Sequence, residues 1–351
     1  MIKNIQKSDG VLGIHHITAI ARNPQRNIDF YTGLLGLRLV KLTVNFDDPA
    51  TYHLYYGDSI GHPGTILTFF PWSEAPKGHR GTGQVTSISF LISSGSMGYW
   101  VDRLKRNDVS FVGPSKRFSD EFVSFYDPDG LMLELISSPS TEFRGQGQEQ
   151  QKQEPDDIWK QSTVTKEHAI RGFHSATLSE EGYERTASLL ADTMGFKLLA
   201  KDNKEGRFRF GIVDKNGNRE RGASSSSMGS IVDLVCQPDM PRGYVGIGTV
   251  HHIAWRAASD KHQIDLRHRL ANEAHLNPTP VLDRIYFHSV YFREPGGILF
   301  EIATDPPGFT IDERPEDLGT QLKLPEWLEP VREKIKRVLP PVNLPGKTIE
   351  Q

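Results

Sequence analysis

The stretch Phe292-Arg293-Glu294-Pro295-Gly296-Gly297-Ile298-Leu299-Phe300-Glu301 is the best guide to the fold, because the chain contains a second stretch similar to it. The copy is Phe125-Tyr126-Asp127-Pro128-Asp129-Gly130-Leu131-Met132-Leu133-Glu134, in which Glu134 matches Glu301 at a spacing of 167 residues. In each copy proline and glycine precede an apolar run, which is typical of a turn between two strands. The repetition predicts a chain built from related units.

A second repeated stretch predicts a helix. The segment 27–35 has an amphipathic pattern, and Gly36 follows it as a helix-ending glycine does. The segment 189–196 repeats the end of this pattern, with Gly195 on Gly36 at a spacing of 159 residues. Together with the strand patterns, these repeats predict four βαβββ units, at residues 13–72, 83–140, 170–237 and 245–310.

The polar run 144–155 separates the first two units from the last two. It is rich in glutamine and offers almost nothing to bury, which is typical of a linker. We therefore predict units one and two at residues 11–140, a linker at 141–168, units three and four at 169–312, and a C-terminal helix and tail at 313–351.

The composition excludes several kinds of partner. The net charge of −3 gives no electrostatic reason to expect nucleic acid or an anionic membrane. No apolar run approaches the ~18 residues of a membrane span, and the N-terminus has no apolar signal segment. The single cysteine, Cys236, excludes an intramolecular disulfide. We expect a cytoplasmic protein, and the sequence leaves open whether it is a homo-oligomer.

Two His-His pairs and one glutamate suggest a metal site. His15-His16 and His251-His252 each open a predicted strand, and Glu301 ends one. A single histidine on a strand is more often structural, but these pairs occupy equivalent places in the first and last units. Two imidazoles and one carboxylate form the ligand set of mononuclear non-haem Fe(II) sites.

Taken together, these residues resemble the vicinal oxygen chelate superfamily, which includes glyoxalases, bleomycin resistance proteins and extradiol dioxygenases. Within it the chain is similar to ring-cleaving dioxygenases that act on hydroquinones. The resemblance is strongest at residues 13–18, 27–37, 52–58, 63–71 and 251–301. It implies an α+β fold in which four βαβββ units pair into two half-open β-barrels, unit one with unit four and unit two with unit three.

The resemblance also implies roles for individual residues. Fe(II) would be held by His16, His252 and Glu301. The residues that orient the ligands, transfer protons or line the substrate pocket would be His15, His251, Thr18, Arg284 and Tyr291. The implied reaction is the opening of the aromatic ring of a diphenol, a substituted hydroquinone, by dioxygen. Read without the resemblance, Arg284 could instead pair with a nearby carboxylate and Tyr291 could belong to the core, and His53 and the aromatic run 69–72 have the same ambiguity.

Three other functions compete with this hypothesis. A catechol extradiol dioxygenase would use the same metal ligands. A glyoxalase-type isomerase needs a second carboxylate in unit one, and counting 49 residues from His16, the spacing between His252 and Glu301, reaches Thr65 instead. The third is a metal-free binding protein of the same fold, which the complete ligand triad disfavours.

The barrel of units two and three is expected to hold no metal. It keeps Glu134, but Ser175 stands where His16 stands in unit one, and the strand that opens unit two has no histidine. One carboxylate alone does not bind a divalent transition metal tightly.

Overall fold

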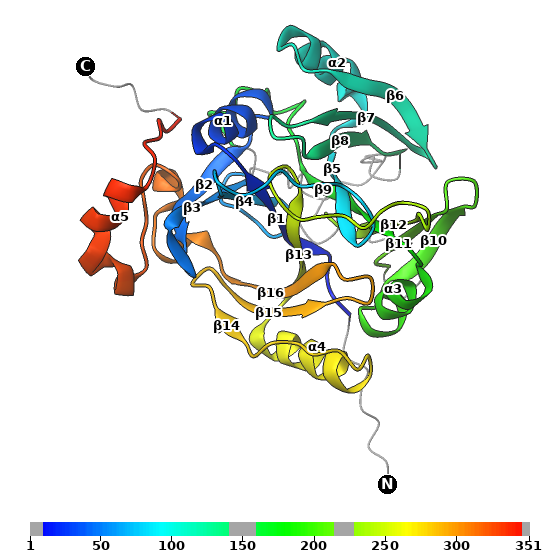
Figure 1. Cartoon of the computed structure of the whole chain (residues 1–351). Helices are drawn as coiled ribbons and strands as arrows, with labels where there is room; N and C mark the ends of the chain where they lie inside the picture. The colour runs from blue at the N-terminus through cyan, green and yellow to red at the C-terminus, as the bar shows by residue number, and fades with distance from the viewer. Residues whose placement is uncertain (1–9, 140–158, 214–227, 346–351) are drawn as a thin grey trace, which may run out of the picture.

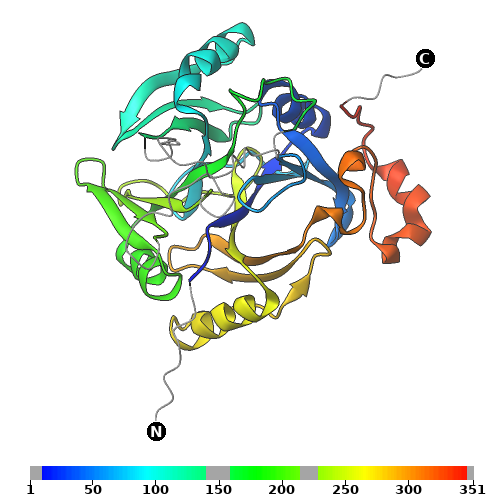
Figure 2. The same ribbon diagram turned by 180° about the vertical axis from the view of Figure 1, so that it is seen from behind.

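A computed structural model describes residues 10–139, 159–213 and 228–345. Its strands form two curled eight-stranded sheets, which confirms the predicted α+β fold of paired half-open barrels. Units one and four form the first barrel, in the strand order β14-β15-β16-β13-β1-β4-β3-β2. Units two and three form the second barrel, in the order β10-β11-β12-β9-β5-β8-β7-β6. Figures 1 and 2 show the two barrels side by side from opposite directions.

Each unit has the predicted order of one strand, a helical segment and three strands. The first barrel takes the following elements from unit one: β1 (Ile14–Ala21), α1 (Pro24–Ile28), the π-helix η1 (Asp29–Leu34), β2 (Arg38–Asn45), β3 (Asp48–Gly57) and β4 (Ile66–Pro71). From unit four it takes β13 (Val250–Ala257), α4 (Asp260–Asn272), β14 (Leu282–Asp283), β15 (Phe287–Arg293) and β16 (Leu299–Pro307).

The second barrel repeats this arrangement. Unit two contributes β5 (Gln84–Leu91), the 3-10 helix η2 (Ser94–Ser96), α2 (Met97–Arg106), β6 (Phe111–Arg117), β7 (Asp120–Tyr126) and β8 (Met132–Ser137). Unit three contributes β9 (Gly172–Glu180), α3 (Glu184–Ser188), the π-helix η4 (Leu189–Thr193), β10 (Lys197–Asp202), β11 (Arg207–Gly211) and β12 (Ile231–Cys236).

Strand pairing at the centre of each barrel joins distant parts of the chain. β1 pairs antiparallel with β13, and β5 pairs antiparallel with β9. Unit one therefore lies beside unit four and unit two beside unit three, as predicted. Neither half of the sequence forms a barrel by itself.

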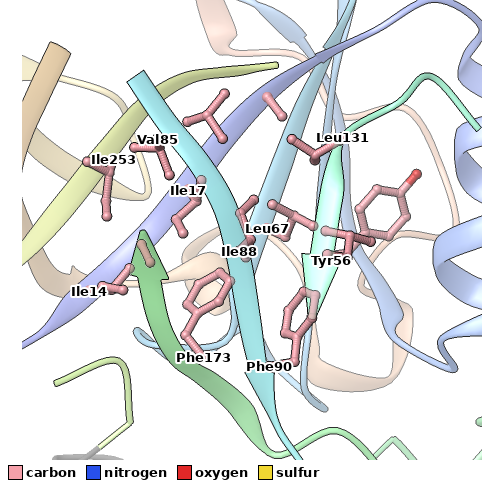
Figure 3. Close-up of a cluster of buried hydrophobic side chains, with 14 of the residues drawn as sticks. Ile14, Ile17, Tyr56, Leu67, Val85, Ile88, Phe90, Leu131, Phe173 and Ile253 are labelled. Atoms are coloured by element: carbon pink, nitrogen blue, oxygen red, sulfur yellow. The ribbon is translucent and has the colours of Figure 1, made fainter. Parts of the chain in front are cut away.

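The main hydrophobic core lies between the two barrels. Figure 3 shows Ile17 of β1, Ile88 of β5, Phe173 of β9 and Ile253 of β13 packed together, and all four are fully buried. Side chains alternate along a strand, so Ile17 faces this core while His16 and Thr18 face the opposite way, into the first barrel. Full burial of one such apolar side chain contributes roughly 1.5–3 kcal/mol, which fixes the strands that carry the histidines.

Gly36 ends the first helical segment with a positive φ of 70°. Its carbonyl accepts a hydrogen bond from Ser162 Oγ at 2.7 Å, and Val164 is buried in the main core. Residues 159–168 of the predicted linker therefore pack against unit one, whereas residues 141–158 lie outside the described part of the chain.

The C-terminal segment covers one side of the first barrel. It contains the 3-10 helices η5 (Phe309–Ile311), η6 (Pro315–Asp317) and η7 (Glu326–Val331), followed by α5 (Arg332–Val338), which Figure 1 shows on the outside of the first barrel. Lys41 of β2 is fully buried and forms ion pairs with Asp312, at 2.7 Å, and with Glu313. No helix in the described ranges is both long and apolar enough to cross a membrane.

Candidate metal centre

Two β-bulges place the His-His pairs. In the β1–β13 ladder Ile14 lies opposite Trp255 and His16 opposite Ala254, so His15 is an extra residue on β1. In the same ladder Thr18 lies opposite His252 and Ala19 opposite Val250, so His251 is an extra residue on β13. A bulge bends the strand and redirects its side chains, and bulges are common beside active sites. Strict alternation along the strand did not predict these bulges.

Inside the first barrel the structure brings together His16, His252 and Glu301. Glu301 Oε2 lies 3.0 Å from His252 Nε2 and 3.4 Å from His16 Nε2, and the two Nε2 atoms lie 3.3 Å apart. Three ligands on one face of an octahedral ion, each at ~2.1 Å, lie ~3.0 Å from one another. The residues therefore have the chemistry and the spacing for one metal ion.

The hydrogen bonds of His15 fix which nitrogen of His16 faces the site. His15 Nε2 lies 3.1 Å from the carbonyl oxygen of Thr304, which can only accept, so Nε2 of this imidazole carries the hydrogen. Burial and the neighbouring His16 lower the pKa of His15 well below its usual value, so the ring is neutral and Nδ1 accepts. The donor at 2.9 Å is then His16 Nδ1, which leaves His16 Nε2 for a metal ion.

His251 makes the matching contact with the other imidazole ligand. Its Nδ1 lies 2.8 Å from Nδ1 of His252. Burial and the proximity of His252 lower the pKa of His251 to about 3. The imidazole is therefore neutral, and it contacts His252 through Nδ1.

Glu301 is fully buried and held in place by Ser289, whose hydroxyl donates to Oε1 at 2.6 Å. Among the described residues, Oε2 has no hydrogen-bond donor in regular geometry. Although burial opposes ionisation, attraction to the nearby His16 and His252 keeps the pKa of Glu301 well below its usual value. The carboxyl group is thus ionised, as a metal ligand has to be.

The predicted pocket residues Tyr291 and Arg284 lie on the same side of the centre. Tyr291 is opposite Glu301 in the β15–β16 ladder, and its ring packs edge-on against His252 at 5.7 Å between centroids. Burial and the charge of Glu301 raise the pKa of Tyr291, so the phenol remains protonated. Arg284 lies 5.8 Å from the centre of the Tyr291 ring and pairs with Asp47 at 3.0 Å, so the pairing with a nearby carboxylate is confirmed while its role in the pocket stays a prediction.

Thr18 and three aromatic residues complete the surroundings of the centre. Thr18 is fully buried and follows His16 by two residues on β1, so both side chains face the same way. Phe70 and Trp72 each lie 5.7 Å from the His251 ring, and Phe70 also contacts the ring of His53 at 4.4 Å. Phe70, Trp72 and His53, which the sequence left undecided between pocket and core, therefore lie near the centre through contacts with His251 and with one another.

The structure corrects the position that was compared with Glu301 in unit one. In unit four Ala254 lies opposite Glu301, and in unit one Thr18, the residue two places after His16, lies opposite Thr68. The equivalent of Glu301 is therefore Thr68 and not Thr65, since the connections between the strands differ by three residues. Thr65 instead accepts a hydrogen bond from the backbone N–H of Asp58 at 3.3 Å. The inference that unit one supplies no carboxylate is unaffected.

In the second barrel, charged side chains surround the equivalent of Glu301. Arg117 donates two hydrogen bonds to Glu134, both at 2.8 Å, and Ser89 donates a third at 2.7 Å. Ser175 replaces the ligand histidine, as the sequence indicated, and its hydroxyl is 3.0 Å from His174 Nδ1. A guanidinium group thus neutralises Glu134, whereas its equivalent in the first barrel, Glu301, faces two imidazoles.

Comparisons with known proteins agree with this architecture. The family model described as "Glyoxalase/Bleomycin resistance protein/Dioxygenase superfamily" matches residues 13–135. The chain is 45% identical to "Putative ring-cleaving dioxygenase MhqO" of Bacillus subtilis (strain 168), over 95% of this chain and 97% of that protein. It is 33% identical to "Chlorohydroquinone/hydroquinone 1,2-dioxygenase" of Sphingobium indicum, over 95% and 98%. A solved structure from Bacillus subtilis, 44% identical, has a TM-score of 0.84 over 95% of this chain and 98% of that one.

Proposed function

The chain belongs to the ring-cleaving dioxygenases of the Glyoxalase/Bleomycin resistance protein/Dioxygenase superfamily, and from this premise we propose that it is an Fe(II)-dependent enzyme that opens the aromatic ring of a substituted hydroquinone with dioxygen. The observation that carries the proposal is the convergence of two imidazole nitrogens and one carboxylate oxygen within 3.4 Å of one another.

The donor set suits Fe(II). Two imidazoles and one carboxylate leave up to three positions of an octahedral ion free, enough for a diphenol oxygen and dioxygen. When bound, Fe(II) would supply the redox chemistry by which triplet dioxygen reacts with a singlet phenol, and Zn²⁺ has no such chemistry.

The surrounding side chains have separate tasks. His15 and His251 orient the imidazole ligands through their Nδ1 contacts. Arg284 stabilises negative charge on the diphenol oxygen or on dioxygen as it is reduced. Tyr291, a protonated phenol beside His252, donates a hydrogen bond into the same space.

Hydroquinone is favoured over catechol by these polar groups. A catechol chelates a metal through two adjacent oxygens, whereas a hydroquinone offers one and needs the protein to fix its orientation. Tyr291, Arg284 and Thr18 are buried or half-buried groups that can do so. The 33% identical relative from Sphingobium indicum, which acts on hydroquinones by name, supports the same choice.

The direct test is oxygen uptake after anaerobic loading with Fe(II). We expect consumption of dioxygen with substituted hydroquinones and ring-opened products that contain both oxygen atoms. Uptake with catechols alone would reject the substrate assignment. Absence of uptake with every diphenol, in protein shown to contain iron, would reject the dioxygenase assignment.

A first variant tests the role of Tyr291. The change Tyr291→Phe keeps the ring against His252 and removes the hydroxyl, so iron content should be unchanged. Loss of one buried hydrogen bond to a charged group costs about 1.5–3 kcal/mol, so kcat/KM for hydroquinone should fall about ten- to a hundredfold. Unchanged turnover in this variant would show that the hydroxyl takes no part.

A further inference from the structure

A chain of four hydrogen-bonded side chains runs along the wall of the first barrel toward the candidate metal centre. Tyr55 OH lies 2.8 Å from His53 Nδ1, His53 Nε2 lies 2.8 Å from Thr68 Oγ1, and Thr68 Oγ1 lies 3.0 Å from Thr18 Oγ1. The residues come from three adjacent strands, β3, β4 and β1. Thr18 is opposite His252 in the β1–β13 ladder, so the chain ends beside a candidate ligand.

The buried phenol at the far end fixes the direction of these hydrogen bonds. Tyr55 is 2% exposed, and within the described ranges His53 is the one hydrogen-bond partner of its hydroxyl, so the phenol donates to Nδ1. A neutral imidazole that accepts at Nδ1 carries its hydrogen on Nε2 and donates it to Thr68. Thr68 then donates to Thr18.

The last hydrogen of the chain has no acceptor among the described residues. Thr18 Oγ1 accepts from Thr68, and its own hydrogen meets no acceptor among the residues that the structure describes. Thr18 is nevertheless fully buried. A buried donor without a partner is costly unless a ligand supplies the acceptor.

We propose that Tyr55, His53 and Thr68 are positioning residues that hold the Thr18 hydroxyl as a hydrogen-bond donor toward an oxygen of the ligand bound beside the metal centre. The proposal rests on the proposed function for the identity of that ligand, a diphenol. A donor fixed in this sense favours a ligand oxygen that accepts and disfavours a ligand group that can only donate. The three residues therefore contribute to specificity without touching the reacting atoms.

The second barrel shows that the fold does not require such a chain. The positions of Tyr55, Thr68 and Thr18 are occupied in the second barrel by Arg209, Asp233 and Thr177. In the first barrel Thr68 lies opposite Tyr55 on one side and Thr18 on the other, and in the second barrel Asp233 lies in the same way between Arg209 and Thr177. Arg209 donates to Asp233 at 2.7 and 2.9 Å, and Arg207, at the position of His53, donates at 3.2 Å. In the second barrel, ion pairs thus replace the neutral chain, and the Thr177 hydroxyl receives no hydrogen bond from the described residues. In the first barrel the chain reaches the equivalent hydroxyl, Thr18, whose own hydrogen has no acceptor in the described ranges.

The first experiment compares two substitutions of His53 in the iron-loaded, full-length protein, with hydroquinone as the probe under anaerobic conditions. His53→Phe keeps an aromatic ring beside Phe70 but breaks the chain, so the dissociation constant should rise about tenfold. His53→Gln loses the ring but can accept from Tyr55 through its oxygen and donate to Thr68 through its nitrogen, so it should recover part of the affinity. The reverse order, Phe tolerated and Gln damaging, would show that His53 only packs.

A double-mutant cycle separates this role from a general weakening of the site. Thr18→Val removes the terminal donor, so His53→Phe should cost nothing further once Thr18 is replaced. Iron content should be the same in all variants. Additive losses in the double variant would overturn the proposal.

A third measurement does not depend on the reaction. In the metal-free protein labelled with ¹⁵N histidine, His53 should be the Nε2-protonated tautomer, and Tyr55→Phe should disturb it. An Nδ1-protonated His53 would reverse the chain and reject the proposal, whatever the enzyme oxidises. Failure of the proposed function would appear differently, as wild-type protein that contains iron and consumes no dioxygen.

Discussion

Glu301→Gln should remove both bound iron and oxygen uptake while the protein remains folded. The amide keeps the size of the side chain and can keep the contact with Ser289, which donates to Oε1. It removes the negative charge that faces the two imidazoles, and a neutral amide oxygen is a much weaker ligand for Fe(II). Loss of a residue that only orients a ligand costs 10–100-fold in metal affinity or activity, so loss of the ligand itself should cost more than about a hundredfold.

The matched control is the same substitution at the equivalent residue of the second barrel. Glu134→Gln should leave one iron per chain and normal oxygen uptake per folded molecule. Iron analysis and an oxygen electrode measure both variants. Two irons in the wild-type protein, with one lost in Glu134→Gln, would contradict the prediction that the second barrel holds no metal.

Arg117→Met should destabilise the protein strongly without altering its metal content. The Glu134 side chain is 1% exposed and depends on two hydrogen bonds from Arg117, whose own side chain is 12% exposed. Removing one partner of a buried ion pair leaves an uncompensated charge, which costs about 3–5 kcal/mol. Urea denaturation at pH 8 should show this loss in the free energy of unfolding.

The loss should shrink as the pH is lowered. In the wild-type protein burial opposes ionisation, but the hydrogen bonds and charge of Arg117 keep the pKa of Glu134 below its ordinary 4.5, so its contribution is present above that pH and is lost in acid. In the variant that lacks Arg117, burial should raise the pKa of Glu134 above 4.5. The folded variant is therefore more stable at low pH and loses stability as the pH rises. The double variant Arg117→Met/Glu134→Gln should recover stability at pH 8. A deficit that is constant between pH 4 and pH 8 would show that Glu134 is not its source.

The repeat spacings predicted the fold because residues at equivalent positions of two units occupy equivalent places in the structure. The match of Gly195 to Gly36 and of Glu134 to Glu301 identified four units, and the structure pairs them as the resemblance implied. The same spacing of 167 residues also places Arg117 on Arg284, so the guanidinium in the second barrel could have been found by the same comparison.

Other features of the centre could not be found from the repeat spacings. His53 has an arginine at its repeat position, so comparison of the units gives no reason to select it. Thr65 was compared with Glu301 in place of Thr68 because residues were counted across connections of unequal length. Only the strand register gives the correct equivalent of Glu301. The bulges at His15 and His251 interrupt the alternation of side chains along β1 and β13, and no repeat spacing indicates them.

Because the first unit pairs with the fourth, the candidate metal centre needs residues from both ends of the barrel-forming sequence. His16 is made early, but Glu301 is followed by only 50 of the 351 residues, so a chain that stops before the fourth unit contains one of the three ligands. A chain that stops before the fourth unit therefore lacks two of the three candidate ligands. Because the candidate centre comes together only when β1 pairs with β13, the proposed Fe(II) would be held only by protein in which the first barrel has closed.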